Sequence, residues 1–225
     1  MAHDGPIYAA MAEHLRGAPG RPYDAGLGDV IARVSRVAEP IVGPWIADTV
    51  RGLAPRRVLD VGCGTGVNLR WMARAAPAGA TLVGVDVDPD AAEAARDNIR
   101  TWGLDGVTTR QADLHALPPD LTSEPWDLVL LAQNIYYWPV EERSAVLARL
   151  RDLAGPAGTV VAITAVPTRM ALVRNLDLVL RVIDGCGRLP TREELHSDAT
   201  AAGFGQVSVR DIIPGGGMAA LVARG

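Results

Sequence analysis

The stretch VLDVGCGTG, residues 58–66, decides the fold of this chain. An apolar run that contains one acid leads into glycine at every second position, and apolar residues at helical spacing follow. This pattern predicts a strand, a tight turn and then a helix. Glycine lets the backbone approach a ligand closely because no Cβ stands in the way, and the helix N-terminus offers free N–H groups beside it. The sequence therefore predicts a ligand-binding turn between this strand and its helix.

A second strand, TLVGVD at 81–86, ends in another acid. Asp86 lies about 20 residues beyond the glycine turn, a spacing typical of an acid that binds ribose hydroxyls from the next strand. A dinucleotide fingerprint needs G-x-G-x-x-G/A, but the sixth position counted from Gly62 is Val67. The dinucleotide pattern therefore fails at Val67, which argues against NAD.

The glycine spacing of residues 62–66, with Leu-Asp before it and Gly-Val-Asp at 84–86, resembles the nucleoside-binding half of class I S-adenosylmethionine-dependent methyltransferases. The resemblance covers roughly residues 55–224. It implies a Rossmann-like α/β fold, in which a seven-stranded, mostly parallel sheet has helices on both faces and an antiparallel last strand. It also implies S-adenosylmethionine as the cofactor.

Hydrophobic periodicity and turn residues organise the rest of the chain. Residues 1–54 are expected to form an N-terminal helical lid segment, with a helix over 26–52 that is broken near Pro40 and Pro44. Residues 55–225 are expected to form the cofactor-binding domain, with an inserted helix in 168–187. The predicted strands are 57–61, 81–86, 107–111, 127–132, 159–165, 206–212 and 218–223, and the predicted helices lie at 66–76, 88–103, 139–154 and 191–202.

The resemblance assigns cofactor contacts to four segments. An acid after the third strand accepts a hydrogen bond from the adenine amino group in the family, and Asp113 fills that position with Leu114 packing on the ring. Asp113 as the cap of a turn is the simpler alternative. Cysteine is common at the position of Cys63, where it has no covalent role. The expected cofactor-binding residues are Asp60, Gly62, Cys63, Gly64, Gly66, Asp86, Val87, Asp113, Leu114, Gln133 and Asn134.

The loop QNIYYWP, residues 133–139, is where relatives place the acceptor. DNA-amine methyltransferases carry an Asp/Asn-Pro-Pro-Tyr/Phe turn here, and its absence disfavours that class. Tyr136 and Tyr137 are candidate catalytic residues that could wall an apolar pocket and face a sulfonium. Strand alternation would send only one of them into the pocket. In the alternative, Trp138 and one tyrosine simply pack the loop onto the sheet.

Composition excludes several classes of protein. The net charge is −4, and the arginines are interleaved with acids, so no nucleic-acid partner is expected. No stretch approaches the ~20 apolar residues of a membrane span, and no signal peptide is visible, so the expected location is the cytoplasm. The four histidines lack metal-ligand spacing, so no metal is expected. His14 is a candidate general base if the N-terminal segment covers the active site, and otherwise a solvent-exposed histidine.

The sequence resembles the small-molecule methyltransferases of secondary metabolism, and this resemblance implies methyl transfer to the O, N or C atom of a small, substantially apolar molecule. Residues 8–50 and the inserted helix carry more apolar side chains than one buried face requires, so we expect them to roof the acceptor pocket. They could instead cover sheet edges or meet in a dimer, so monomer and homodimer both stay open. The alternative function is a protein of the same fold that binds S-adenosylmethionine for other chemistry or for sensing, because fold does not fix function.

Overall fold

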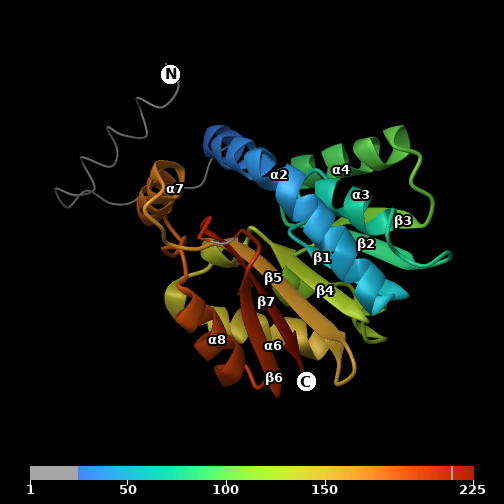
Figure 1. Ribbon diagram of the computed structural model, residues 1–225. Coiled ribbons are helices and arrows are strands. Elements are labelled where there is room, and N and C mark those ends of the chain that lie inside the picture. The colour runs from blue at the N-terminus through green and yellow to red at the C-terminus, as the bar shows by residue number, and fades with distance from the viewer. Residues whose placement is uncertain (1–24, 214) are drawn as a thin grey trace.

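The computed structural model describes residues 25–213 and 215–225, with only the backbone described for residues 25–36. It contains one seven-stranded sheet in the order β3-β2-β1-β4-β5-β7-β6 (Figure 1). The first five strands along the chain are parallel, and β7 is antiparallel to both of its neighbours. This order confirms the predicted sheet and its reversed last strand. The strands are β1 (Arg57–Val61), β2 (Thr81–Asp86), β3 (Val107–Gln111), β4 (Leu128–Ala132), β5 (Thr159–Ala165), β6 (Gln206–Asp211) and β7 (Met218–Arg224).

Side-chain alternation along the strands divides the core into two layers. Leu59 and Val61 of β1 face a cluster that includes Leu147 and Leu150 of a helix on one side of the sheet. Val58 faces the opposite cluster, which lies under helices on the other side. Figure 1 shows α6 and α8 below the sheet and α2, α3 and α4 across its other face. The helices are α2 (Ala25–Leu53), α3 (Val67–Ala73), α4 (Pro89–Thr101), α5 (Pro119–Thr122), α6 (Arg143–Ala154), α7 (Ala171–Arg181) and α8 (Arg192–Ala201).

Helix α2 corrects one prediction, because it runs without interruption through Pro40 and Pro44. Both prolines are exposed, so water can satisfy the carbonyls that they leave without an N–H partner. The opposite side of the helix packs Val42 and Ile46 into the core. A Cβ at Gly43 would overlap the ring of Trp71, which shows how closely α2 approaches α3. Packing against the core therefore stabilises α2 as one helix, although its two prolines disfavour helix locally.

The other boundaries lie close to their predictions. Asp88 caps α4 by accepting a hydrogen bond from the Asp90 N–H at 2.9 Å, as its position before Pro89 predicts. The helix predicted to open at Pro139 begins with a 3₁₀ turn (Val140–Glu142) and becomes α-helical at Arg143. The inserted helix is α7, whose inner face packs on Tyr136, Ala165 and Leu189. Within the described ranges, no helix is long and apolar enough to cross a membrane.

Candidate functional site: the glycine turn and the carboxyl edge of the sheet

The carboxyl ends of β1, β2 and β4 lie side by side, because Val61 is in register with both Val85 and Leu131. The glycine turn after β1 therefore lies between Asp86 at the end of β2 and the loop that follows β4. In open α/β sheets, ligands bind at this edge, where the strand order reverses. Here the reversal lies between β1 and β4, so the turn predicted from sequence is placed at the expected switch point.

Two glycines of the turn serve different purposes. Gly62 has φ +68°, and a Cβ there would lie 2.7 Å from Cγ of Asn134, so this glycine makes room for a side chain of the protein. Gly64 has φ +52°, and a Cβ there would meet no atom within 4 Å. Its N–H donates to Oδ2 of Asp86 at 2.8 Å, which fixes the turn against β2. The bare backbone of Gly64 therefore faces open space, as a turn that cradles a ligand requires.

Cys63 faces inward between these glycines. It is 5% exposed, and a Cβ at Gly84 would lie 2.8 Å from its Sγ, so the thiol fills the space that Gly84 leaves. Burial raises the pKa of this thiol well above its usual range, and the nearby charge of Asp60 adds to the effect. A buried neutral thiol is a poor nucleophile, in agreement with the expectation of no covalent role.

Asp86 is held in place by backbone donors. Its Oδ2 accepts from Gly64, and its Oδ1 accepts from the Asp88 N–H at 3.0 Å. Burial raises the pKa of this half-buried carboxyl, while these backbone hydrogen bonds act in the opposite direction. Each carboxylate oxygen can accept a second hydrogen bond. Asp86 is therefore fixed at the turn with capacity for hydroxyl donors, and its neighbour Val87 is 67% exposed.

Asp60, the second acid of the site, lacks the backbone donors that hold Asp86. Its side chain is 0% exposed, and neither carboxyl oxygen has a hydrogen-bond partner among the described residues. Burial, followed by the charge of Asp86, raises the pKa of Asp60 well above its usual range. A buried acid of this kind favours a cationic partner. S-adenosylmethionine carries a sulfonium, an ammonium and a ribose diol, so the open turn and the two acids fit it.

The remaining predicted cofactor residues occupy two neighbouring loops. Gly66 has φ +81° and is the N-cap of α3. Asp113 accepts from the His115 N–H at 2.9 Å, so it does cap a turn, as the simpler alternative held, and Leu114 is 4% exposed within the core. The structure leaves their adenine role a prediction. Ala112 joins this loop to the site, since its N–H donates to the Asp86 carbonyl at 2.9 Å.

The loop after β4 is tied to the glycine turn. Asn134 directs Nδ2 to the carbonyls of Val61, Gly62 and Ala132 at 3.2, 2.9 and 2.9 Å. Gln133 adopts φ +62°, a conformation that costs free energy for a residue with a Cβ and often marks a functional site. Neither the hydrogen bonds of Asn134 nor the backbone conformation of Gln133 could be predicted from the sequence. Asn134 therefore acts at least as a strut between β4 and the turn, and its contact with the cofactor stays a prediction.

The tyrosines correct a premise of the sequence reasoning. Residues 135–137 form a 3₁₀ turn rather than a strand, so strand alternation does not apply to them. Tyr136 is 1% exposed in the cluster under α7, Tyr137 is half-buried, and their ring centroids are 5.0 Å apart at 62°. Which of them reaches a bound acceptor stays a prediction. His14 lies outside the described residues, and the described part holds no group of three His, Cys, Asp or Glu side chains that could bind a metal.

Comparison with known proteins agrees with this geometry. Residues 58–158 match the family model described as a methyltransferase domain. A curated relative, methyltransferase GfsG of Streptomyces halstedii, is 32% identical over 144 residues, which are 64% of this chain and 48% of the relative. The chain thus spans about half the length of that relative.

Two solved structures show the same fold. An O-methyltransferase family protein from Burkholderia thailandensis has a TM-score of 0.73 and 22% identity, covering 90% of this chain and 60% of that one. Human N-acetylserotonin methyltransferase in complex with S-adenosylmethionine has a TM-score of 0.75 and 16% identity, covering 97% of this chain and 66% of that one. Residues 58–158 therefore match a methyltransferase domain, and the chain shares the fold of these solved methyltransferases.

Proposed function

We propose that this protein transfers the methyl group of S-adenosylmethionine to an O, N or C atom of a small, substantially apolar molecule. The observation that carries the proposal is the bare turn at Gly64, whose N–H lies 2.8 Å from Oδ2 of Asp86 and which follows Asp60, a buried acid with no hydrogen-bond partner among the described residues. These three residues offer backbone surface, hydroxyl acceptors and negative charge to a cationic nucleoside.

The residues of the chain then have distinct tasks. Asp86 accepts hydrogen bonds from the ribose hydroxyls, and Asp60 supplies negative charge for a cation. Asp113, Leu114 and Val87 surround the adenine. Gln133 and Asn134 fix the loop that separates the cofactor from the acceptor.

When bound, S-adenosylmethionine supplies a methyl group on a sulfonium, a leaving group that needs no covalent enzyme intermediate. With Gly64 and Asp86 holding the donor, an acceptor beside the loop 133–139 would take up the methyl group, and the sulfur would keep the electron pair of the broken bond. The protein holds the reactants in line and excludes water, effects that can supply roughly 7–11 kcal/mol. An acceptor proton leaves to solvent or to a base such as His14.

The small-molecule class rests on the loop 133–139 and on the names of two structural neighbours. The loop lacks the two prolines of the DNA-amine class. Tyr136 lies in an apolar cluster with Ala165, Val173 and Leu176, and Tyr137 packs against that cluster. One neighbour is named an O-methyltransferase and another is named for N-acetylserotonin, which favours a small acceptor and an oxygen atom.

The test has two stages. Calorimetry with S-adenosylhomocysteine and with NAD comes first, and we expect binding of the former only. Purified protein is then given S-adenosylmethionine with panels of small phenols, amines and acidic carbon compounds, and with ribosomal RNA, and the release of S-adenosylhomocysteine is measured. Turnover with a small apolar compound supports the proposal. Turnover with RNA alone refutes the acceptor class, and binding without turnover in any panel favours the binding-protein alternative.

A further inference from the structure

Arg143, the first residue of α6, is a buried cation that the proposed chemistry does not use. Its side chain is 0% exposed. Nη2 donates to the carbonyl oxygen of Arg188, while Nε and Nη1 have no partner among the described residues. Burial lowers the pKa of Arg143, and the charge of Asp198 opposes this effect. Burying a cation without a carboxylate in direct contact is costly, so this position calls for a reason.

The guanidinium meets the segment between α7 and α8 at Gly187. A Cβ at Gly187 would lie 2.6 Å from Nη2 of Arg143 and 2.7 Å from the carbonyl oxygen of Trp138. The N–H of Gly187 donates to the carbonyl oxygen of Tyr136 at 2.9 Å. Gly187 is thus packed between Arg143 and the backbone of the loop after β4, and no larger residue fits without displacing one of them.

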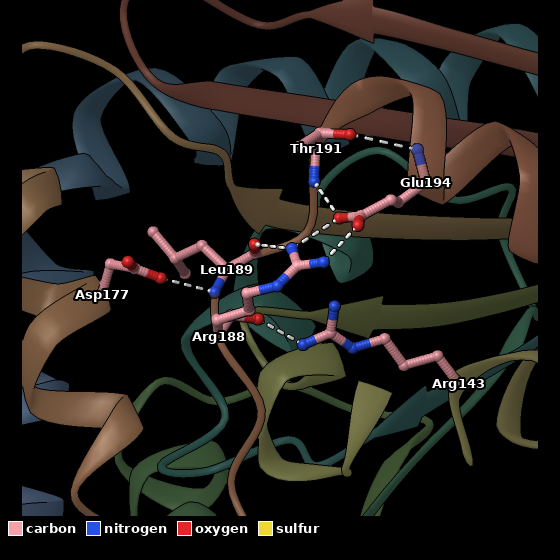
Figure 2. A network of polar contacts seen from close by, with 6 residues as sticks. All are labelled: Arg143, Asp177, Arg188, Leu189, Thr191 and Glu194. Carbon is pink, nitrogen blue, oxygen red and sulfur yellow. Dashed lines mark hydrogen bonds and ion pairs between the residues drawn. The ribbon is translucent and has the colours of Figure 1, made fainter. Parts of the chain in front are cut away.

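The same segment is held at its other end by a hydrogen bond to α7, an ion pair and the capping box of α8 (Figure 2). The Leu189 N–H donates to Oδ1 of Asp177 on α7 at 2.8 Å. The guanidinium of Arg188 contacts both carboxylate oxygens of Glu194, and Glu194 forms a capping box with Thr191 at the start of α8. The segment 184–191 therefore has anchors on three helices, and Arg143 is its anchor on α6.

We propose that Arg143 is a positioning residue for the loop segment Tyr136–Trp138, which we expect to line the acceptor pocket. Through the carbonyl of Arg188 and the packing of Gly187, it fixes the backbone of Tyr136–Trp138 beside the site. The cofactor side of the same loop is held separately, because Asn134 is tied to Val61 and Gly62. Loss of Arg143 should therefore loosen the tyrosines and leave the cofactor turn in place. The link to methyl transfer rests on the proposed function, whereas the link to the loop does not.

The test uses two variants that act on the contact from opposite sides, Arg143→Met and Gly187→Ala. Arg192→Met is the matched control, since it removes an arginine whose Nε donates to Oδ1 of Asp211, the last residue of β6, at 2.5 Å. Amide hydrogen exchange is measured by NMR in the presence of S-adenosylhomocysteine. We expect exchange at least tenfold faster at the amides of residues 137 and 187 in both test variants, with the amides of β1 and β4 unchanged and with the control like the wild type.

Calorimetry and kinetics supply the second readout. Affinity for S-adenosylhomocysteine should stay within twofold in both variants. With whichever acceptor the wild type turns over, KM for the acceptor should rise at least tenfold while KM for S-adenosylmethionine does not change. Unchanged exchange at 137 and 187 overturns the proposal, as does faster exchange spread over the whole sheet. If Arg143→Met does not fold, Gly187→Ala alone decides. If the wild type turns over no acceptor, the proposed function fails, while the exchange rates still test the role of Arg143.

Discussion

Replacing Asp86 with alanine should weaken the binding of S-adenosylhomocysteine at least about tenfold. A hydrogen bond to a charged group contributes roughly 1.5–3 kcal/mol, and about 1.4 kcal/mol corresponds to one factor of ten in affinity. The loss has a second source in this chain. The carboxylate also accepts the N–H of Gly64 at 2.8 Å and of Asp88 at 3.0 Å, so the variant loses the contact that fixes the turn.

The control for this prediction is Asp88→Ala. Asp88 is the neighbouring acid and the next candidate for the ribose, but it is exposed and caps α4. Its removal should lower stability by about 1 kcal/mol, as for other N-caps, and leave affinity unchanged. The assay is calorimetric titration of each folded variant with S-adenosylhomocysteine. Wild-type affinity in Asp86→Ala would show that the wrong acid was chosen, and lost affinity in Asp88→Ala would identify the right one.

Three further predictions test the turn, the buried acid and the N-terminal segment. Gly64→Val should abolish binding of S-adenosylhomocysteine while thermal unfolding stays cooperative, because φ +52° strains a residue with a Cβ by roughly 1–2 kcal/mol and the side chain fills the open space; retained binding would place the ligand elsewhere. Asp60→Asn should gain stability relative to the wild type as pH rises in denaturant titrations of the free protein. The pKa of Asp60 is higher in the folded protein than in the unfolded chain, so the wild type loses folding stability as pH rises through the folded-state pKa, and the asparagine variant does not. A stability difference between variant and wild type that does not change with pH would contradict this. Deleting residues 1–22 should leave the circular dichroism spectrum unchanged and reduce turnover. Full turnover in the deletion variant would show that these residues are not part of the lid.

Periodicity was sufficient to predict the sheet, because the strands are short, β4, β5 and β7 are strongly apolar, and turn residues separate the strands from the helices. The glycine turn and Asp86 could be predicted for the same reason, since they are adjacent to strand ends. Contacts between distant segments could not. The amide of Asn134 bonds to carbonyls 72 and 73 residues away, and Arg143 meets a carbonyl 45 residues away. The continuity of α2 through its two prolines likewise depends on packing of its buried side against the sheet and α3, which the local sequence does not show.

The two acids of the site differ in what holds them, and this difference affects how the protein distinguishes substrate from product. Asp86 has backbone N–H donors on both oxygens, which favour its charged form. Asp60 has no partner in the described part of the chain, so its charged form depends on a cation supplied by the ligand. S-adenosylmethionine brings a positive sulfur, and S-adenosylhomocysteine brings a neutral one. We therefore expect the preference for S-adenosylmethionine over S-adenosylhomocysteine to be smaller in Asp60→Asn than in the wild type, measured as the ratio of the two Kd values. An equal ratio would show that the buried acid does not sense the charge that the reaction removes.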